Sequence, residues 1–93
     1  MILNVICNYD KLLKVFTRPV FTNTPKKDLA ETYRRQIVPA PEKMFELKDM
    51  EVYFLGTYND ERAQFELLDK PEFVVRLEDF FPAKEVEQHV KED

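Results

Sequence analysis

The sequence predicts a small α+β domain, in which an antiparallel sheet of four to five strands forms from two hairpins in the order ββαββ and one helix packs on a face of the sheet. Two observations predict this class. Residues 51–68 hold two apolar, strand-like stretches around a polar turn. Residues 24–38 hold a helix-start signal followed by apolar residues at helical spacing. The 93 residues fit one domain, with its core at about residues 2–81 and a peripheral segment at 82–93.

The first hairpin is predicted near the N-terminus. Residues 2–7 are apolar and rich in β-branched types, which favours a strand buried on much of both faces. Residues 8–11, Asn-Tyr-Asp-Lys, are typical of a turn. The second strand, at residues 15–21, contains Pro19, which has no backbone N–H. We therefore expect this strand to lie at an edge or to contain an irregularity.

The helix is predicted at roughly residues 25–38. Thr24 can cap it, and Pro25 suits its first position because proline has no amide hydrogen to leave unsatisfied. Its apolar residues on one face are Leu29, Ala30, Tyr33 and Ile37. Pro39 stops the pattern. The connector that follows, up to residue 50, offers three side chains to anchor it on the core: Met44, Phe45 and Leu47.

The second hairpin is predicted from strands at residues 51–58 and 63–68, joined by a polar turn at 59–62. Residues 69–71, Asp-Lys-Pro, are expected to end the second of these strands. A further short strand is expected at residues 73–77. After Pro82, a short C-terminal helix is expected at residues 83–89.

Residue chemistry indicates no catalytic or cofactor site, so we expect neither an enzyme nor a bound cofactor. Gly56 is the only glycine, which excludes glycine-rich phosphate loops. One cysteine and one histidine, Cys7 and His89, cannot supply a structural zinc set or an internal disulfide, and we expect Cys7 to be a buried thiol. Two carboxylate pairs are interpreted as turn or surface residues: Asp60 with Glu61 and Glu78 with Asp79.

The chain has no apolar run near the ~18 residues that a membrane-spanning helix needs. It also lacks the basic region and long apolar core of a signal peptide. We therefore expect no membrane association, and a protein that stays in the compartment where it is made.

Net charge is −4 but is unevenly distributed, because residues 1–41 hold seven of the 14 Lys and Arg and only three of the 18 Asp and Glu. Overall acidity weighs against strong nonspecific binding of nucleic acid, which relies on a dominant positive field. A local basic site remains compatible with it. The candidate nucleic-acid-binding residues, with Lys11 beside them, are Lys14, Arg18, Lys26, Lys27, Arg34 and Arg35.

This basic set has two interpretations: ordinary solvated helix charges, or contact with phosphate or an acidic partner. At about 100° per residue, Lys27 and Arg34 lie together at the edge of the apolar stripe, while Arg35 lies further round beside Glu31. They form a patch and not a continuous stripe. Three nearby aromatic residues can stack on bases if exposed, and otherwise belong to the core: Tyr9, Phe16 and Tyr33.

The second hairpin carries a resemblance to a known family. Asp49 and Met50 form a lead-in, residues 52–56 (Val-Tyr-Phe-Leu-Gly) form an apolar and aromatic strand ending in glycine, and residues 58–60 (Tyr-Asn-Asp) open a turn. In this order and spacing the chain resembles the small nonstructural protein of gokushovirus-type single-stranded DNA phages, within the Microviridae.

The N-terminal region adds to the resemblance. Residues 9–11 (Tyr-Asp-Lys), Phe16 and residues 19–21 (Pro-Val-Phe) follow the order in which that family opens before its helix. The resemblance thus covers roughly residues 2–68. Its motifs are short and mostly structural.

Three positions depart from the family pattern. Leu47 stands where the family has a proline, and Ala63 stands where it has a turn glycine suited to positive φ. These two put the detailed turn geometry in question. Glu31 aligns with an arginine common in the family's helix, which questions any basic role carried over to that helix and leaves Arg34 and Arg35 as substitutes.

The resemblance implies an accessory phage protein, absent from the virion, with a role in viral DNA synthesis or in the switch from replication to genome packaging, in the cytoplasm of the bacterial host. It brings no catalytic residues. Our leading hypothesis is a nonenzymatic accessory factor that contacts single-stranded DNA or a phage replication or capsid protein. The alternative is a protein-interaction module or homodimer that uses an exposed face or edge of the sheet and binds no nucleic acid.

Overall fold

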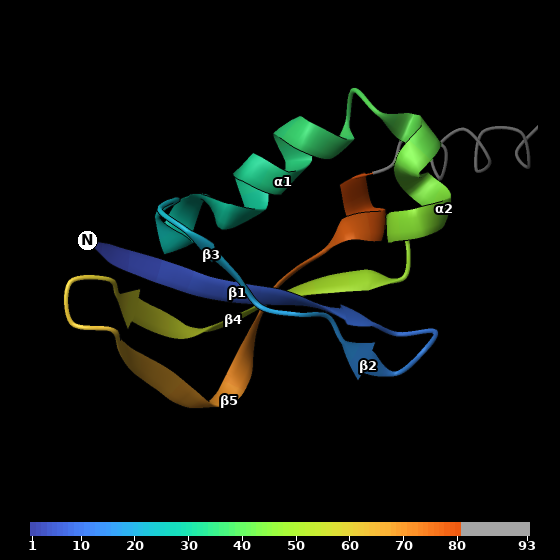
Figure 1. The fold of residues 1–93 in the computed structure, drawn as a ribbon. Coiled ribbons are helices and arrows are strands. Elements are labelled where there is room, and N and C mark those ends of the chain that lie inside the picture. The colour runs from blue at the N-terminus through green and yellow to red at the C-terminus, as the bar shows by residue number, and fades with distance from the viewer. Residues whose placement is uncertain (81–93) are drawn as a thin grey trace, which may run out of the picture.

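The computed structural model of the chain describes residues 1–80, which form a curled antiparallel sheet with helices on one side (Figure 1). The strands are β1 (Ile2–Asp10), β2 (Val15–Phe16), β3 (Val20–Thr22), β4 (Met50–Asn59) and β5 (Gln64–Arg76). The helices are α1 (Leu29–Ile37) and α2 (Met44–Leu47), with short 3₁₀ turns η1 (Lys26–Asp28), η2 (Pro41–Lys43) and η3 (Leu77–Phe80).

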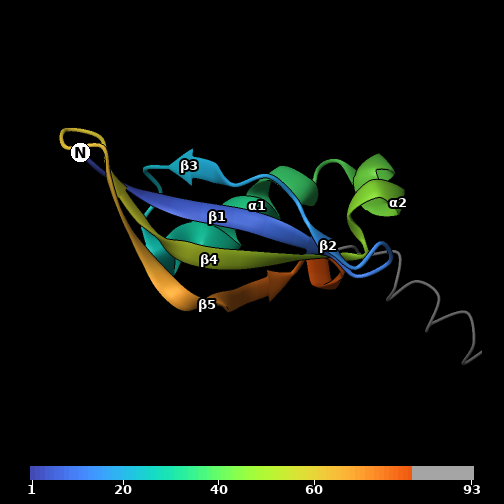
Figure 2. The same cartoon turned by 60° about the horizontal axis from the view of Figure 1, so that its bottom comes forward.

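β1 and β4 are the central strands. They pair with each other along nearly their whole length, and the sheet order is β2-β1-β4-β5, with β3 also paired to β1. Figure 2 views the sheet from its open side, with α1 behind the strands. The predicted α+β class, the antiparallel sheet and the single main helix are therefore confirmed.

The predicted order ββαββ differs from the structure, which has three strands before α1. The expected strand at residues 15–21 is divided into β2 and β3, which pair with opposite ends of β1. Pro19 lies in the gap between them and cannot donate a ladder hydrogen bond. The expected edge position and irregularity at this proline are confirmed.

The predicted helix is confirmed as η1 followed by α1, and Leu29 and Ile37 are buried on its sheet-facing side. The predicted Thr24 cap is wrong, because the first turn has no side-chain cap. The Thr24 hydroxyl instead accepts a hydrogen bond from Thr22 Oγ1 at 3.0 Å, and the Thr24 carbonyl accepts one from Asn4 Nδ2 at 2.7 Å. These contacts attach the start of the helix to the sheet.

The predicted second hairpin is confirmed, but the separate strand at residues 73–77 is wrong. β5 continues as one strand through Pro71, with shifts in its register against β4. As the last strand of the sheet, β5 has an outer side that needs no ladder hydrogen bonds, so an edge proline is tolerated there. The helix expected at residues 83–89 lies outside the described residues.

A bulge in β4 exchanges the two sides of the sheet. Ile6 pairs with Phe54 and Val5 pairs with Gly56, so Leu55 is an extra residue in β4. Because successive strand residues point to opposite sides, this one-residue insertion reverses the side that each later residue of β4 faces. Phe54 therefore faces α1, whereas Gly56 and Tyr58 face the opposite side.

Two small clusters form the core between α1 and the sheet. One joins Ile37, Val52 and Leu77, and the other joins Ile6, Leu29 and Phe54, while Tyr33 and Val74 pack against both. The expected anchor of the connector is right for Leu47, which packs on the first cluster, and wrong for Phe45, which is 79% exposed. The side chain of Met44 lies outside the described part of the structure.

Gly56→Ala should strongly destabilise the fold. Gly56 has φ +143°, and a Cβ there would overlap the carbonyl oxygen of Glu66 and lie 2.7 Å from Leu67 Cα on β5. We expect a loss of about 2–4 kcal/mol in the free energy of unfolding, measured by urea titration at one fixed protein concentration. Thr57→Ala, on the next residue of β4, should cost less than about 1 kcal/mol. Equal losses in the two variants would contradict the steric argument.

Ala63→Gly should stabilise the hairpin. Ala63 has φ +54°, a left-handed conformation that costs a residue with a Cβ about 1 kcal/mol or more. Since glycine adopts this conformation freely, we expect a gain of roughly 0.5–1 kcal/mol in the same urea titration. The matched substitution Ala30→Gly, inside α1, should instead lose about that amount.

Candidate functional site

The two arginines of α1 are paired with a carboxylate of the same helix. Arg34 Nε donates to Glu31 Oε1 at 2.9 Å, and Arg35 Nε lies 3.3 Å from Glu31 Oε2. The hydrogen bond from Arg34 is the main reason that the pKa of Glu31 lies below its ordinary value, and the same contact raises the pKa of Arg34. Glu31, which stands where the resembled family has an arginine, thus offsets one of the two positive charges that α1 contributes to the predicted basic site.

The lysines at the start of the helix lie beside β5. Lys26 Nζ lies 2.6 Å from Glu72 Oε2 and 4.7 Å from the centre of the Phe54 ring. Lys27 lines the same shallow groove, together with Ala30 and residues 72–74. The groove therefore contains an internal ion pair and is not a uniformly positive surface.

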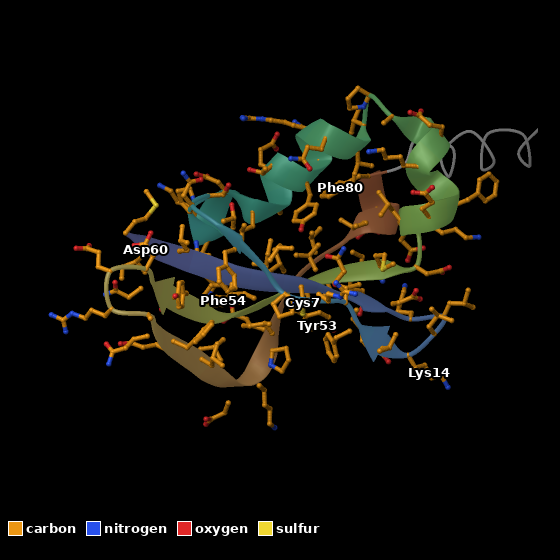
Figure 3. The ribbon with its side chains drawn as sticks, viewed as in Figure 1. Cys7, Lys14, Tyr53, Phe54, Asp60 and Phe80 are labelled. Carbon is orange, nitrogen blue, oxygen red and sulfur yellow. The ribbon has the colours of Figure 1, made fainter. Side chains whose placement is uncertain are left out.

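The two remaining members of the predicted site lie elsewhere. Lys14 is in the turn between β1 and β2, at the end of the sheet away from the start of α1 (Figure 3). Arg18 lies between β2 and β3 at the sheet edge. The six basic residues therefore do not form one surface, and their contact with nucleic acid stays a prediction.

Among the described residues, the carboxylate pairs take part in ion pairs at or near the surface. Asp60 and Glu61 contact the ammonium group of Met1, Glu78 contacts Lys11, and Asp79 contacts Arg76. Within residues 1–80, no three His, Cys, Asp or Glu side chains are arranged to hold a metal ion. Cys7 is buried as expected, and burial raises the pKa of its thiol. His89 lies outside the described residues.

The side of the sheet turned away from α1 is covered with aromatic rings. Figure 3 shows Tyr53 directed away from α1 and its neighbour Phe54 directed toward it. Strand pairing and ring contacts place seven aromatic residues, contributed by all five strands, on the Tyr53 side. We call this surface the aromatic face; it consists of Tyr9, Phe16, Phe21, Tyr53, Tyr58, Phe65 and Phe73.

Tyr53 is the centre of one group of rings. Its ring centroid lies 5.5 Å from that of Phe16, 5.8 Å from that of Phe73 and 6.4 Å from that of Tyr9, all with edge-to-face geometry. Pairs of this kind contribute about 0.5–1.5 kcal/mol each beyond the area they bury. The rings therefore hold one another in a fixed arrangement across four strands.

Tyr58 is the centre of the second group. Its ring centroid lies 4.7 Å from that of Phe65 and 5.1 Å from that of Phe21. Because Tyr58 follows the bulge, it is on the same side of the sheet as Tyr53, although their positions differ by five, an odd number that would otherwise place them on opposite sides. The bulge thus joins the two groups of rings on one face.

The tip of the β4–β5 hairpin shows which side of the sheet is apolar. There Tyr58 pairs with Phe65 on the aromatic face, whereas the pairs on the other side are polar, Thr57 with Glu66 and Asn59 with Gln64. In an antiparallel sheet with one solvated side, the apolar side is the one that is buried against another layer. At the tip, that side is the aromatic face.

The aromatic face is nevertheless open in the described chain. Its four phenylalanines are about half exposed: Phe16 46%, Phe21 48%, Phe65 53% and Phe73 51%. Single exposed apolar residues are ordinary, but a contiguous group of this kind marks an interaction site. This face is therefore our candidate functional site.

Sequence reasoning missed the aromatic face. It considered Tyr9 and Phe16 as stacking residues only if exposed, and Phe16 is indeed about half exposed. The available signal was in β4, where Val52, Tyr53 and Phe54 are consecutive apolar residues, so that both sides of the strand are apolar. One helix can cover only one of these sides.

Comparison of the chain with protein-family models, curated proteins and solved structures finds no match in any of the three. The gokushovirus resemblance therefore rests on the sequence motifs alone. Within the part of the chain that the structure describes, no helix is long and apolar enough to cross a membrane.

The pairing of Glu31 is directly testable by NMR titration of its carboxyl group. In the wild-type protein the pKa of Glu31 should lie below its ordinary value, and Arg34→Ala should raise it toward that value. Arg35→Ala should raise it less, because Arg34 provides the main hydrogen bond. Since the folded-state pKa is lowered, any stability from this pair is present above the pKa of unfolded Glu31 and is lost as pH falls through the folded-state value. A larger effect from Arg35→Ala would contradict this assignment.

Proposed function

We propose that this chain is a nonenzymatic accessory protein that works by protein–protein contact through the aromatic face. The observation that supports the proposal is the open side of the sheet, where seven interlocked aromatic side chains stand without a covering layer in residues 1–80. Interface cores are enriched in aromatic residues and depleted of charge. The aromatic face has this composition, in a chain of which 34% is charged.

Contact with protein is favoured over contact with DNA by the distribution of charge. A single-stranded nucleic acid is held by cations that follow its backbone beside aromatic rings that stack on its bases. In this chain the basic residues of α1 lie on the helix side of the sheet and the aromatic face lies on the other. One strand of DNA cannot use both at once. Glu31 and Glu72 further reduce the positive charge on the helix side.

The gokushovirus resemblance gives the proposal its setting. It suggests an accessory role in single-stranded DNA replication or in the switch to genome packaging, within the bacterial cytoplasm. In that setting, the contacts of the chain would serve its assembly with a phage replication or capsid protein. The part of the chain that supports the resemblance, roughly residues 2–68, also contains six of the seven rings, all except Phe73.

Capture from infected cells tests the proposal. The tagged chain should recover a phage replication or capsid protein, and nuclease treatment should not change this recovery. Phe73→Lys should abolish it, because an unpaired charge buried in an apolar interface is strongly unfavourable. Phe45→Lys is the matched control, since Phe45 is an exposed phenylalanine of α2, away from the aromatic face.

A binding assay with labelled single-stranded DNA at low salt tests the alternative, in which the chain binds DNA. We expect no binding above that of an acidic control protein. DNA binding that weakens with added salt and with the double variant Lys27→Glu/Arg34→Glu would contradict the proposal and favour the basic residues as the working surface. Recovery of the phage protein that Phe73→Lys leaves unchanged would contradict the role of the aromatic face.

A further inference from the structure

The aromatic face needs a cover that the described chain does not provide. α1 and η3 lie on the other side of the sheet, where the core clusters are. An antiparallel sheet that faces water on one side normally alternates apolar and polar residues along its strands, so that the solvent-exposed side is polar. Here that alternation is replaced by apolar residues on both sides of β1 and β4.

We propose that a second copy of this chain covers the aromatic face, sheet against sheet, in a two-fold symmetric dimer. The inference rests on the proposed function, in which the same surface contacts protein, and the second copy and the phage protein then compete for this surface. Two sheets packed in this way lie about 10 Å apart with their side chains interdigitated, as in a β-sandwich. The helices of the two copies then form the outer layers of the assembly.

The charge of the aromatic face favours a second copy. Among the strand residues that pair in the ladder, this side carries one acid and one base, Glu51 and Arg76, which are register partners at one end of the sheet. The Tyr53 hydroxyl donates to Glu51 Oε1 at 3.1 Å, so the acid is held against the rings. A two-fold contact brings identical surfaces together, and a face without net charge does not repel itself although the whole chain carries −4.

The size of the aromatic face matches what a stable dimer needs. Each half-exposed phenylalanine offers about 100 Å² of accessible surface, given the roughly 200 Å² that a free aromatic side chain can bury. With the partly exposed tyrosines and Leu67, the face offers roughly 600 Å² per copy, or about 1,200 Å² for a pair. Specific interfaces begin near 1,000 Å² in total.

The sheet edge is a poorer site for self-association. β5 is the edge strand beside β4, and it contains Lys70, Pro71 and two shifts of register. Charged residues, proline and bulges are the usual devices that prevent edge-to-edge pairing. The opposite edge is divided at Pro19 between the short strands β2 and β3. Both edges are therefore blunted, whereas the aromatic face is not.

The small core of the chain also favours a constant partner. In residues 1–80, eight hydrophobic residues are buried, and two of them, Val5 and Cys7, belong to the aromatic-face side of β1. A chain of this size has little core to spare. A second copy is always present with the first, so the dimer interface supplies a second core whenever the protein is made.

Sedimentation equilibrium tests the dimer over protein concentrations from about 1 to about 100 µM. We expect twice the single-chain mass of 11.2 kDa at the upper end. Phe65→Lys and Phe73→Lys should each raise the dimer dissociation constant at least about 30-fold, because each substitution enters a two-fold interface twice. Phe45→Lys, on α2, should leave it unchanged.

A second measurement keeps the test decisive if a face variant fails to fold. In a mixture of ¹³C-labelled and unlabelled wild-type chains, isotope-filtered NOEs should connect the aromatic rings of one copy with those of the other. A monomer throughout the concentration range would overturn the dimer. Intermolecular NOEs that involve only the edge strands β5 or β2, and not the aromatic rings, would overturn it as well. If the chain is a monomer but Phe73→Lys still abolishes capture of the phage protein, the dimer is wrong and the proposed function stands.

Discussion

Leu55 is an extra residue in β4 with no partner on β1. Because of it, the residues of β4 from Gly56 onward face the side opposite to the one that unbroken alternation would give them, and this determines which side chains each surface of the sheet displays. Before this point, β4 directs Val52 and Phe54 toward α1, where they enter the two core clusters. Beyond it, the same alternation directs Tyr58 away from the helix. Without the insertion, Tyr58 and its partners would lie on the helix side and the aromatic face would end halfway along the sheet. The close approach of β5 at Gly56 leaves no room for a side chain at this position.

The two sides of the sheet carry different kinds of side chain, charged on one and aromatic on the other. Charges are gathered around α1 and at the hairpin turns, where they form pairs such as Lys26 with Glu72 and Arg34 with Glu31. Exposed pairs of this kind contribute little to stability, but they reduce the net field of the helix surface. The other side carries the rings, which are ordered by contact with one another and not by a covering helix. A surface that is rigid before it meets a partner loses less conformational entropy on association, which favours binding.

Much of the fold follows from local sequence signals. The hairpin around residue 60, the helix that brings Leu29 and Ile37 to the sheet, and the irregularity at Pro19 all depend on spacing and on backbone chemistry that single residues reveal. The continuous path of β5 through Pro71 and the loss of the Thr24 cap depend on where the strands and Asn4 lie in three dimensions. The candidate site was hidden for the same reason. Its rings come from five strands, and the side that Tyr58 takes depends on a bulge that the alternation of residues in β4 does not reveal.

Cys7 lies within the aromatic-face side of β1, paired with Tyr53, and is almost completely shielded although the rings around it are partly exposed. Alkylating reagents can reach its sulfur only when the structure around it opens, and burial also raises the pKa of the thiol, which lowers the fraction of reactive thiolate. The rate of its modification therefore reports how often the surface opens. Alkylation of this single thiol therefore measures the opening rate of the aromatic face within the intact protein.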